Sequence, residues 1–162
     1  MTAPLSSAYD VVLGVHVTAV VIAFGVTFAY PIIFAVGARQ SPRSMPLLHR
    51  ITLATERILV NGGLVIVLGA GIFLASDGHH WSEFFVQWGI AVVVVIGGVV
   101  SAVTIPASKR AAELAERDVA AAGEGELEMS AEYQAIVRRL QIVGSALSAL
   151  VVVTIFIMAT KP

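Results

Sequence analysis

The sequence predicts an all-α polytopic membrane protein, in which four transmembrane helices form one bundle. The 162-residue chain is 57% hydrophobic and 13% charged, and its mean hydropathy is +0.89. A soluble domain carries about 25% charged residues, so this composition is typical of a membrane protein. The length suits a single four-helix domain, residues 1–162, without a separate soluble domain. The predicted spans are residues 11–36, 58–75, 84–107 and 142–158.

The first apolar run, residues 11–36, contains no Asp, Glu, Lys or Arg, and its one histidine is His16. A hydrocarbon core of roughly 30 Å needs about 20 helical residues, so this run is long enough to span. We expect a permanent first span and not a cleaved signal peptide, because the run is long and an arginine-containing segment follows it. Pro31 lacks a backbone N–H group and should kink this helix near Thr27.

The third and fourth helices should continue beyond their apolar runs as a helical hairpin, residues 108–141. The segment after residue 107 is rich in alanine and has high helix propensity. A break is expected at Gly123–Gly125, and helix should resume near Ser130. The hairpin carries an apolar seam that predicts either self-packing or a docking surface for a cytoplasmic partner. The seam residues are Leu114, Val119, Leu127, Met129, Tyr133, Ile136 and Val137.

Basic residues predict the orientation of the helices. Of ten Lys and Arg residues, four lie in the first connection and five in the third. The positive-inside rule places those connections in the cytoplasm and both termini outside, so the third and fourth helices extend into the cytoplasm. This pattern predicts a multi-pass protein of the bacterial inner membrane. The nine residues are Arg39, Arg43, Arg50, Arg57, Lys109, Arg110, Arg117, Arg138 and Arg139, and the tenth is Lys161.

Several function classes have no support in the sequence. There is no cysteine, which excludes disulfides, iron–sulfur clusters and thiolate zinc sites within the chain. The net charge of -1 gives no indication of nucleic-acid binding. Phosphate-binding loops, nucleophile elbows and HExxH zinc motifs are missing too, so no enzyme class is indicated and we expect no catalytic residues.

His16 is the strongest candidate site residue, because ionisable side chains inside a membrane are costly and mark functional sites. It lies on the predicted outer side together with His79 and His80. These three imidazoles could bind a divalent metal, or His16 could bind haem. The alternative is that His16 only bonds a neighbouring helix and that His79 and His80 form a solvated turn. The carboxylates on that side are Asp10, Asp77 and Glu83.

Two further polar features lie near the basic side of the bundle. His49 precedes the second apolar run, so the predicted topology separates it from His16 by most of the membrane and excludes these two as ligands of one haem. No basic residue inside a span could pair with a porphyrin carboxylate. Glu56, Arg57 and Asn61 form a polar cluster that suits a substrate site or an interfacial anchor with an asparagine that pairs helices.

Two segments carry a family resemblance. The run Leu13–Gly25 has a histidine followed by small and apolar residues and a mid-helix glycine, and Gly62–Leu74 is a glycine-rich span with Trp81 shortly after it. Residues 9–110 resemble small bacterial integral membrane proteins of unknown function. They are distantly similar to copper-resistance D proteins and to four-helix membrane protoporphyrinogen oxidases. The resemblance to the oxidases implies that His16 is a candidate haem ligand.

The sequence leads to two functional hypotheses. The first is a non-enzymatic accessory or stabilising subunit of a larger inner-membrane complex, such as a transport or envelope-lipid assembly, without a cofactor. Its partners would be the lipid bilayer, other integral membrane subunits and a cytoplasmic protein at the hairpin. The alternative is a haem- or metal-binding membrane redox protein that uses His16. The predicted partner-binding residues are Val92, Val93, Val94, Gly97, Ser101, Arg117, Tyr133 and Arg138.

Overall fold

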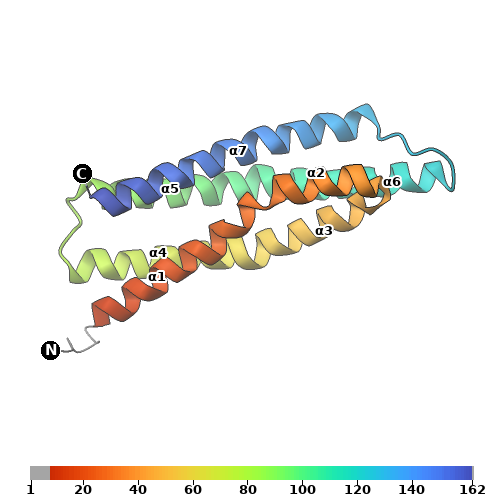
Figure 1. Ribbon diagram of the computed structural model, residues 1–162. Helices are drawn as coiled ribbons and strands as arrows, with labels where there is room; N and C mark the ends of the chain where they lie inside the picture. Colours follow the sequence, from red (N-terminus) through yellow and green to blue (C-terminus); the bar gives the residue numbers. More distant parts are fainter. Residues whose placement is uncertain (1–7, 162) are drawn as a thin grey trace.

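The computed structural model describes residues 8–161, and this part of the chain consists of helices joined by short loops, without strands. Figure 1 shows long helical rods lying side by side in an elongated bundle. All four rods are long and apolar enough to cross a membrane, which confirms the predicted fold class at that level. Residues 1–7 of the N-terminal tail lie outside the described residues. The rods are Ala8–Gln40, Pro42–Asp77, Phe84–Ala122 and Ala131–Thr160.

The first rod changes direction near its middle (Figure 1). Helix α1 (Ala8–Gly25) is followed by a 3-10 turn at Val26–Phe28 and then by α2 (Tyr30–Gln40). Pro31 lies in the first turn of α2, where its missing N–H group costs no hydrogen bond, and the preceding turn tightens. The predicted kink near Thr27 is confirmed.

The second rod follows after a single non-helical residue, Ser41. It comprises a 3-10 turn, α3 (Met45–Thr55), a π-helical turn (Glu56–Val60) and α4 (Asn61–Asp77). In the π turn the Asn61 N–H group bonds to the Glu56 carbonyl five residues back. Helix α3 therefore joins α4 as one long rod with a local widening between them.

The third and fourth rods are both longer than the apolar runs that they contain. Helix α5 (Phe84–Val99) passes through a second π turn (Val100–Thr104) into α6 (Ile105–Ala122). Gly123 then ends the helix with a φ of +52°, a left-handed conformation that glycine adopts without strain. Helix α7 (Ala131–Thr160) runs back along α5 and α6 (Figure 1).

The bundle has two separate hydrophobic clusters. One lies between α1, α4, α5 and α7 and includes Phe24, Leu64 and Ile96. The other lies at the opposite end, where Met45 of α3 packs with Leu114 of α6 and Tyr133 of α7. Helices α2 and α3 thus pack against the α6–α7 hairpin, a contact that was not predicted from the sequence. Much of the hairpin's apolar seam is therefore covered within the chain.

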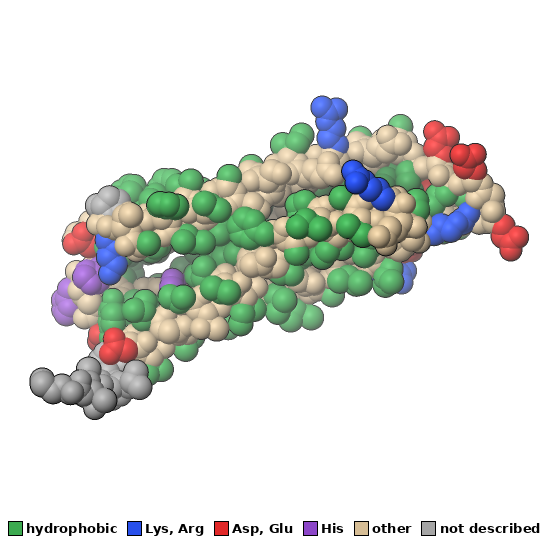
Figure 2. Space-filling view, viewed as in Figure 1, with side chains coloured by type: hydrophobic (Ala, Val, Ile, Leu, Met, Phe, Trp, Pro, Cys, Tyr) green, Lys and Arg blue, Asp and Glu red, His purple; other side chains and the backbone are tan. Residues whose placement is uncertain are grey.

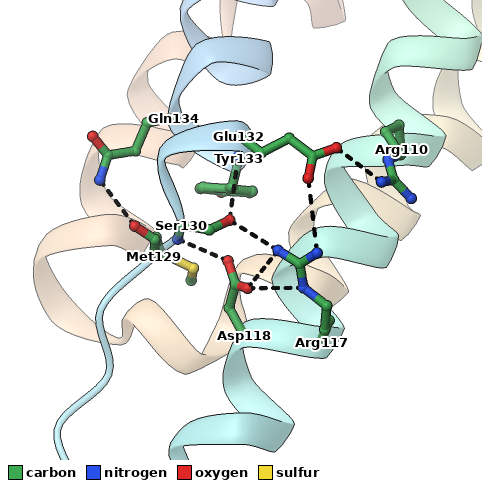
Figure 3. A network of polar contacts seen from close by, with 8 residues as sticks. All are labelled: Arg110, Arg117, Asp118, Met129, Ser130, Glu132, Tyr133 and Gln134. Atoms are coloured by element: carbon green, nitrogen blue, oxygen red, sulfur yellow. Dashed lines mark hydrogen bonds and ion pairs between the residues drawn. The ribbon is translucent and has the colours of Figure 1, made fainter.

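A polar network joins α6 to α7 beside the loop that connects these two helices (Figure 3). The Ser130 backbone N–H group donates to Asp118 Oδ2 at 2.8 Å, and Arg117 pairs with Asp118 Oδ1 at 3.1 Å. The Ser130 hydroxyl caps α7 by accepting from the Tyr133 backbone N–H group at 3.3 Å. Asp118 is 9% exposed, so its carboxylate is shielded from water and fixes the start of α7.

Candidate functional site

A cavity of about 410 Å³, here called the outer cavity, opens between α1, α4, α5 and α7. It lies at the end of the bundle where α1 begins and α7 ends, and Figure 2 shows a hollow there. Its wall is almost entirely apolar and includes Phe24, Val93, Ile96 and Met158. Cavities of roughly 300–1,000 Å³ with few polar groups are typical small-molecule sites.

His16 projects from α1 among these apolar walls, and its side chain is half-buried. Its Nδ1 atom lies 3.0 Å from the Val67 carbonyl oxygen of α4. A carbonyl oxygen can only accept a hydrogen bond, so Nδ1 carries the proton and Nε2 keeps its lone pair. No hydrogen bond to Nε2 is present within the described residues. His16 therefore offers the outer cavity an acceptor nitrogen that could bind a metal.

Two glycines of α4 bring this helix close to α1. A Cβ atom at Gly71 would lie 3.4 Å from His16 Cε1, so the glycine leaves room for the imidazole ring. A Cβ atom at Gly63 would overlap the Ala23 side chain. The tight α1–α4 contact therefore fixes the His16 ring, whereas the open volume of the outer cavity extends toward α5 and α7.

Tyr9, His80 and Lys161 add polar groups to the lining of the outer cavity. Lys161 caps the C-terminal end of α7, and its Nζ atom lies 5.6 Å from the centre of the Phe85 ring. Sequence reasoning assigned Lys161 only to a tail. The one available signal was that Lys161 is the single basic residue outside the two basic connections.

The predicted metal residues separate into two groups. His16 and His80 line the outer cavity, whereas His79 does not. The His79 ring lies instead against its own turn, with Nδ1 3.2 Å from the Asp77 carbonyl oxygen. Among residues 8–161, no group of three or more His, Cys, Asp and Glu side chains is placed to hold a metal ion. A site built from all three histidines remains a prediction.

His49 lies in the other cluster and does not line the outer cavity. It is 2% exposed, its Nε2 atom lies 3.1 Å from the Tyr133 hydroxyl, and its ring centre is 4.8 Å from that of Phe34. Its environment is thus that of a packed core histidine. The positions of His49 and His16 agree with the expectation that they do not share one ligand.

The predicted partner-binding residues differ in their accessibility. Val92 and Tyr133 are each 6% exposed and are covered by other parts of this chain. Val93 and Gly97 are half-buried. A partner could reach the remaining four residues without a rearrangement of the bundle. These are Val94, Ser101, Arg117 and Arg138.

The structure has four helices long and apolar enough to cross a membrane, which is consistent with a multi-pass membrane protein. An apolar cavity lies between these helices. No protein-family model, curated protein or solved structure matches the chain. The geometry of the outer cavity and its residues is therefore the basis for a functional assignment.

Proposed function

We propose that the protein binds haem inside the membrane, in the outer cavity, and serves as a membrane redox protein. The observation that carries the proposal is the hydrogen bond from His16 Nδ1 to the Val67 carbonyl oxygen, 3.0 Å long. Histidines that bind metals almost always donate their other ring N–H group to a carbonyl or carboxylate. This bond fixes the ring and leaves Nε2 free to bind iron.

The other residues of the outer cavity fit the same group. Its volume of about 410 Å³ and its apolar wall suit a flat, largely apolar ligand. Lys161 and His80 line the same cavity and could pair with the porphyrin carboxylates, although the apolar runs themselves contain no basic residue. When bound, haem would supply one-electron transfer. The chain would hold the iron through His16 and exclude water with its apolar wall.

The absorption spectrum of protein purified from its own membranes tests this proposal. We expect a Soret band in the wild type, its loss in His16→Ala and its retention in His79→Ala. His79 is the matched control because it lies at the same end of the bundle but does not line the outer cavity. A wild-type protein purified without a Soret band, and without haem in an acid–acetone extract, would rule the proposal out.

A second candidate function is an accessory subunit of a larger bacterial inner-membrane complex, such as a transport or envelope-lipid assembly. One observation favours it: only 6% of the apolar window of α7 is buried within the chain, compared with 33% for the second rod. A helix with so little internal cover suits contact with another membrane subunit. The exposed side chains of Val94 and Ser101 add to that surface from the third rod.

Purification from native membranes in a mild detergent tests the accessory role. This role predicts a second membrane protein at a fixed ratio to the chain. Recovery of the chain alone, with no stoichiometric partner, would contradict it. The haem proposal would be unaffected by that result, because the outer cavity lies within a single chain.

A further inference from the structure

The carboxyl group of Glu56 is buried near the start of the second apolar run, outside the outer cavity. Glu56 is 5% exposed, and its Oε2 atom has no hydrogen-bond partner. Within residues 8–161, two other buried side-chain oxygens share this condition, Tyr30 Oη and Thr104 Oγ1. Buried polar groups without partners cost free energy and are rare in native folds, so three together need an explanation.

Each of these three residues lies at an irregularity in its helix. Tyr30 follows the 3-10 turn that separates α1 from α2. Glu56 begins one π turn, and Thr104 ends the other. Isolated π turns inside α-helices are rare and are frequent at functional sites. Each of the three unpartnered oxygens thus belongs to a different rod, at a point where that rod deviates from a regular α-helix.

Tyr30 and Ser108 lie near Glu56, and Thr104 is placed beside Ser108 by its helical spacing. Tyr30 lies within electrostatic range of the Glu56 carboxyl group, and the Ser108 hydroxyl lies beside that carboxyl group. Ser108 is 2% exposed, and it follows Thr104 by one helical turn, so both hydroxyls lie on the same face. We call Tyr30, Glu56, Thr104 and Ser108 the inner polar cluster.

The chemistry of the inner polar cluster is that of an oxygen-only cation site with one negative charge. None of the ion pairs among the described residues includes Glu56, and the neighbouring Arg57 is exposed. A buried carboxyl group is neutral when it holds a proton, and as a carboxylate it needs a compensating positive charge, which one monovalent cation supplies. Carboxylate and hydroxyl oxygens suit hard cations and not soft metals.

We propose that the inner polar cluster binds one small monovalent cation, with sodium as the ion that its oxygens fit. The carboxylate of Glu56 provides the charge, and the three hydroxyls complete the coordination shell. The site joins α2, the two π turns and α6, so an ion there would tie three of the four rods together. The proposal is independent of haem binding, because none of the four residues lines the outer cavity.

Sodium binding can be measured directly by ²³Na NMR on the full chain in lipid nanodiscs, at constant ionic strength maintained with choline chloride. We expect saturable binding by the wild type and binding weakened by at least about tenfold in Glu56→Gln. Tyr30→Phe and Thr104→Val remove one oxygen each and should weaken binding by a smaller factor. Glu124→Gln, which changes an exposed acid, should bind as the wild type does.

Two outcomes would overturn the proposal. One is wild-type protein without saturable sodium binding, or Glu56→Gln with unchanged binding. The other is an infrared band of a protonated carboxyl group that disappears in Glu56→Gln and does not respond to sodium, because the site would then hold a proton. If Glu56→Gln does not fold, unchanged sodium binding by both Tyr30→Phe and Thr104→Val would equally contradict the assignment.

Discussion

At the scale of single residues, one backbone carbonyl distinguishes the two ring nitrogens of His16. The Val67 oxygen accepts from Nδ1, so the nitrogen left for a ligand is Nε2. His49 shows the contrast, because its Nε2 atom is already within 3.1 Å of the Tyr133 hydroxyl. Two histidines that the sequence places near membrane spans thus have different surroundings, and of the two only His16 lines the outer cavity.

Neighbouring glycines on α4 provide a test of the α1–α4 contact. Gly63→Ala should lower the free energy of unfolding by about 1–3 kcal/mol, because the new Cβ atom would overlap Ala23. Gly62→Ala should leave it unchanged or raise it by up to about 1 kcal/mol, because no atom lies within 4 Å and alanine has the higher helix propensity. Unfolding in mixed detergent measures both variants. Equal effects of the same sign would contradict the packing.

Asp118 is predicted to stabilise the start of α7. Asp118→Asn removes the charge that accepts from the Ser130 backbone N–H group and from Arg117, so we expect a loss of about 1–3 kcal/mol in unfolding free energy. The exposed Glu126→Gln should change this quantity little. Thermal unfolding in detergent compares them. Matching midpoints for the two variants would show that the network in Figure 3 contributes nothing.

At the scale of elements, Arg43 ties the second rod to the loop between α6 and α7. Its guanidinium donates to the carbonyl oxygens of Gly123 and Gly125, each at 2.6 Å. This contact links residues about 80 positions apart and shows that the first connection and the loop lie together. The loop itself contains several exposed glutamates, so the rate of cleavage by a glutamate-specific protease can report its mobility.

Arg43→Gln should loosen that loop. A protease that cleaves after glutamate should then cut within residues 124–128 several-fold faster than in the wild type, because two hydrogen bonds to the loop backbone are lost. Arg39→Gln removes an exposed charge from the preceding helix and serves as the control. Identical cleavage rates for the two variants would contradict a structural role for Arg43.

The elements also show what the sequence could and could not predict. The four apolar runs, the kink at Pro31 and the break at Gly123 are visible in the sequence because they depend on local composition and backbone chemistry. The π turns are not visible, since they depend on a hydrogen bond that shifts by one residue without a change in hydropathy. The covering of the hairpin by α3 depends on long-range packing.

The candidate site likewise contains side chains that could be identified from the sequence and others that could not. His16 could be selected from the sequence, because a histidine within an apolar run is conspicuous. His80 was grouped with His16 and His79 from the sequence, but its separation from His79 depends on how the turn before α5 folds, and the position of Lys161 depends on where α7 ends. Glu56 was part of a polar cluster that suited a substrate site or an interfacial anchor, and its burial is visible only in the fold.

At the scale of the whole molecule, the distribution of basic residues predicts the orientation in the membrane, and this prediction is open to a direct test. The chain has no cysteine, so a single introduced cysteine reports one position. Ser82→Cys, in the turn before α5, should react with a membrane-impermeant thiol reagent in intact cells. Ser41→Cys, in the basic first connection, should react only after permeabilisation. The reverse pattern would contradict the predicted topology.

The central claim is that the outer cavity holds haem at His16, and a haem titration of the ligand-free protein in nanodiscs tests it most directly. The matched variants are Val93→Phe, which fills the outer cavity, and Val94→Phe, whose side chain lies outside it and is 63% exposed in the wild type. We predict one haem per chain for the wild type and for Val94→Phe, and affinity lower by at least about tenfold for Val93→Phe. Absence of saturable binding to the wild type, or equal affinity in both variants, would contradict the claim.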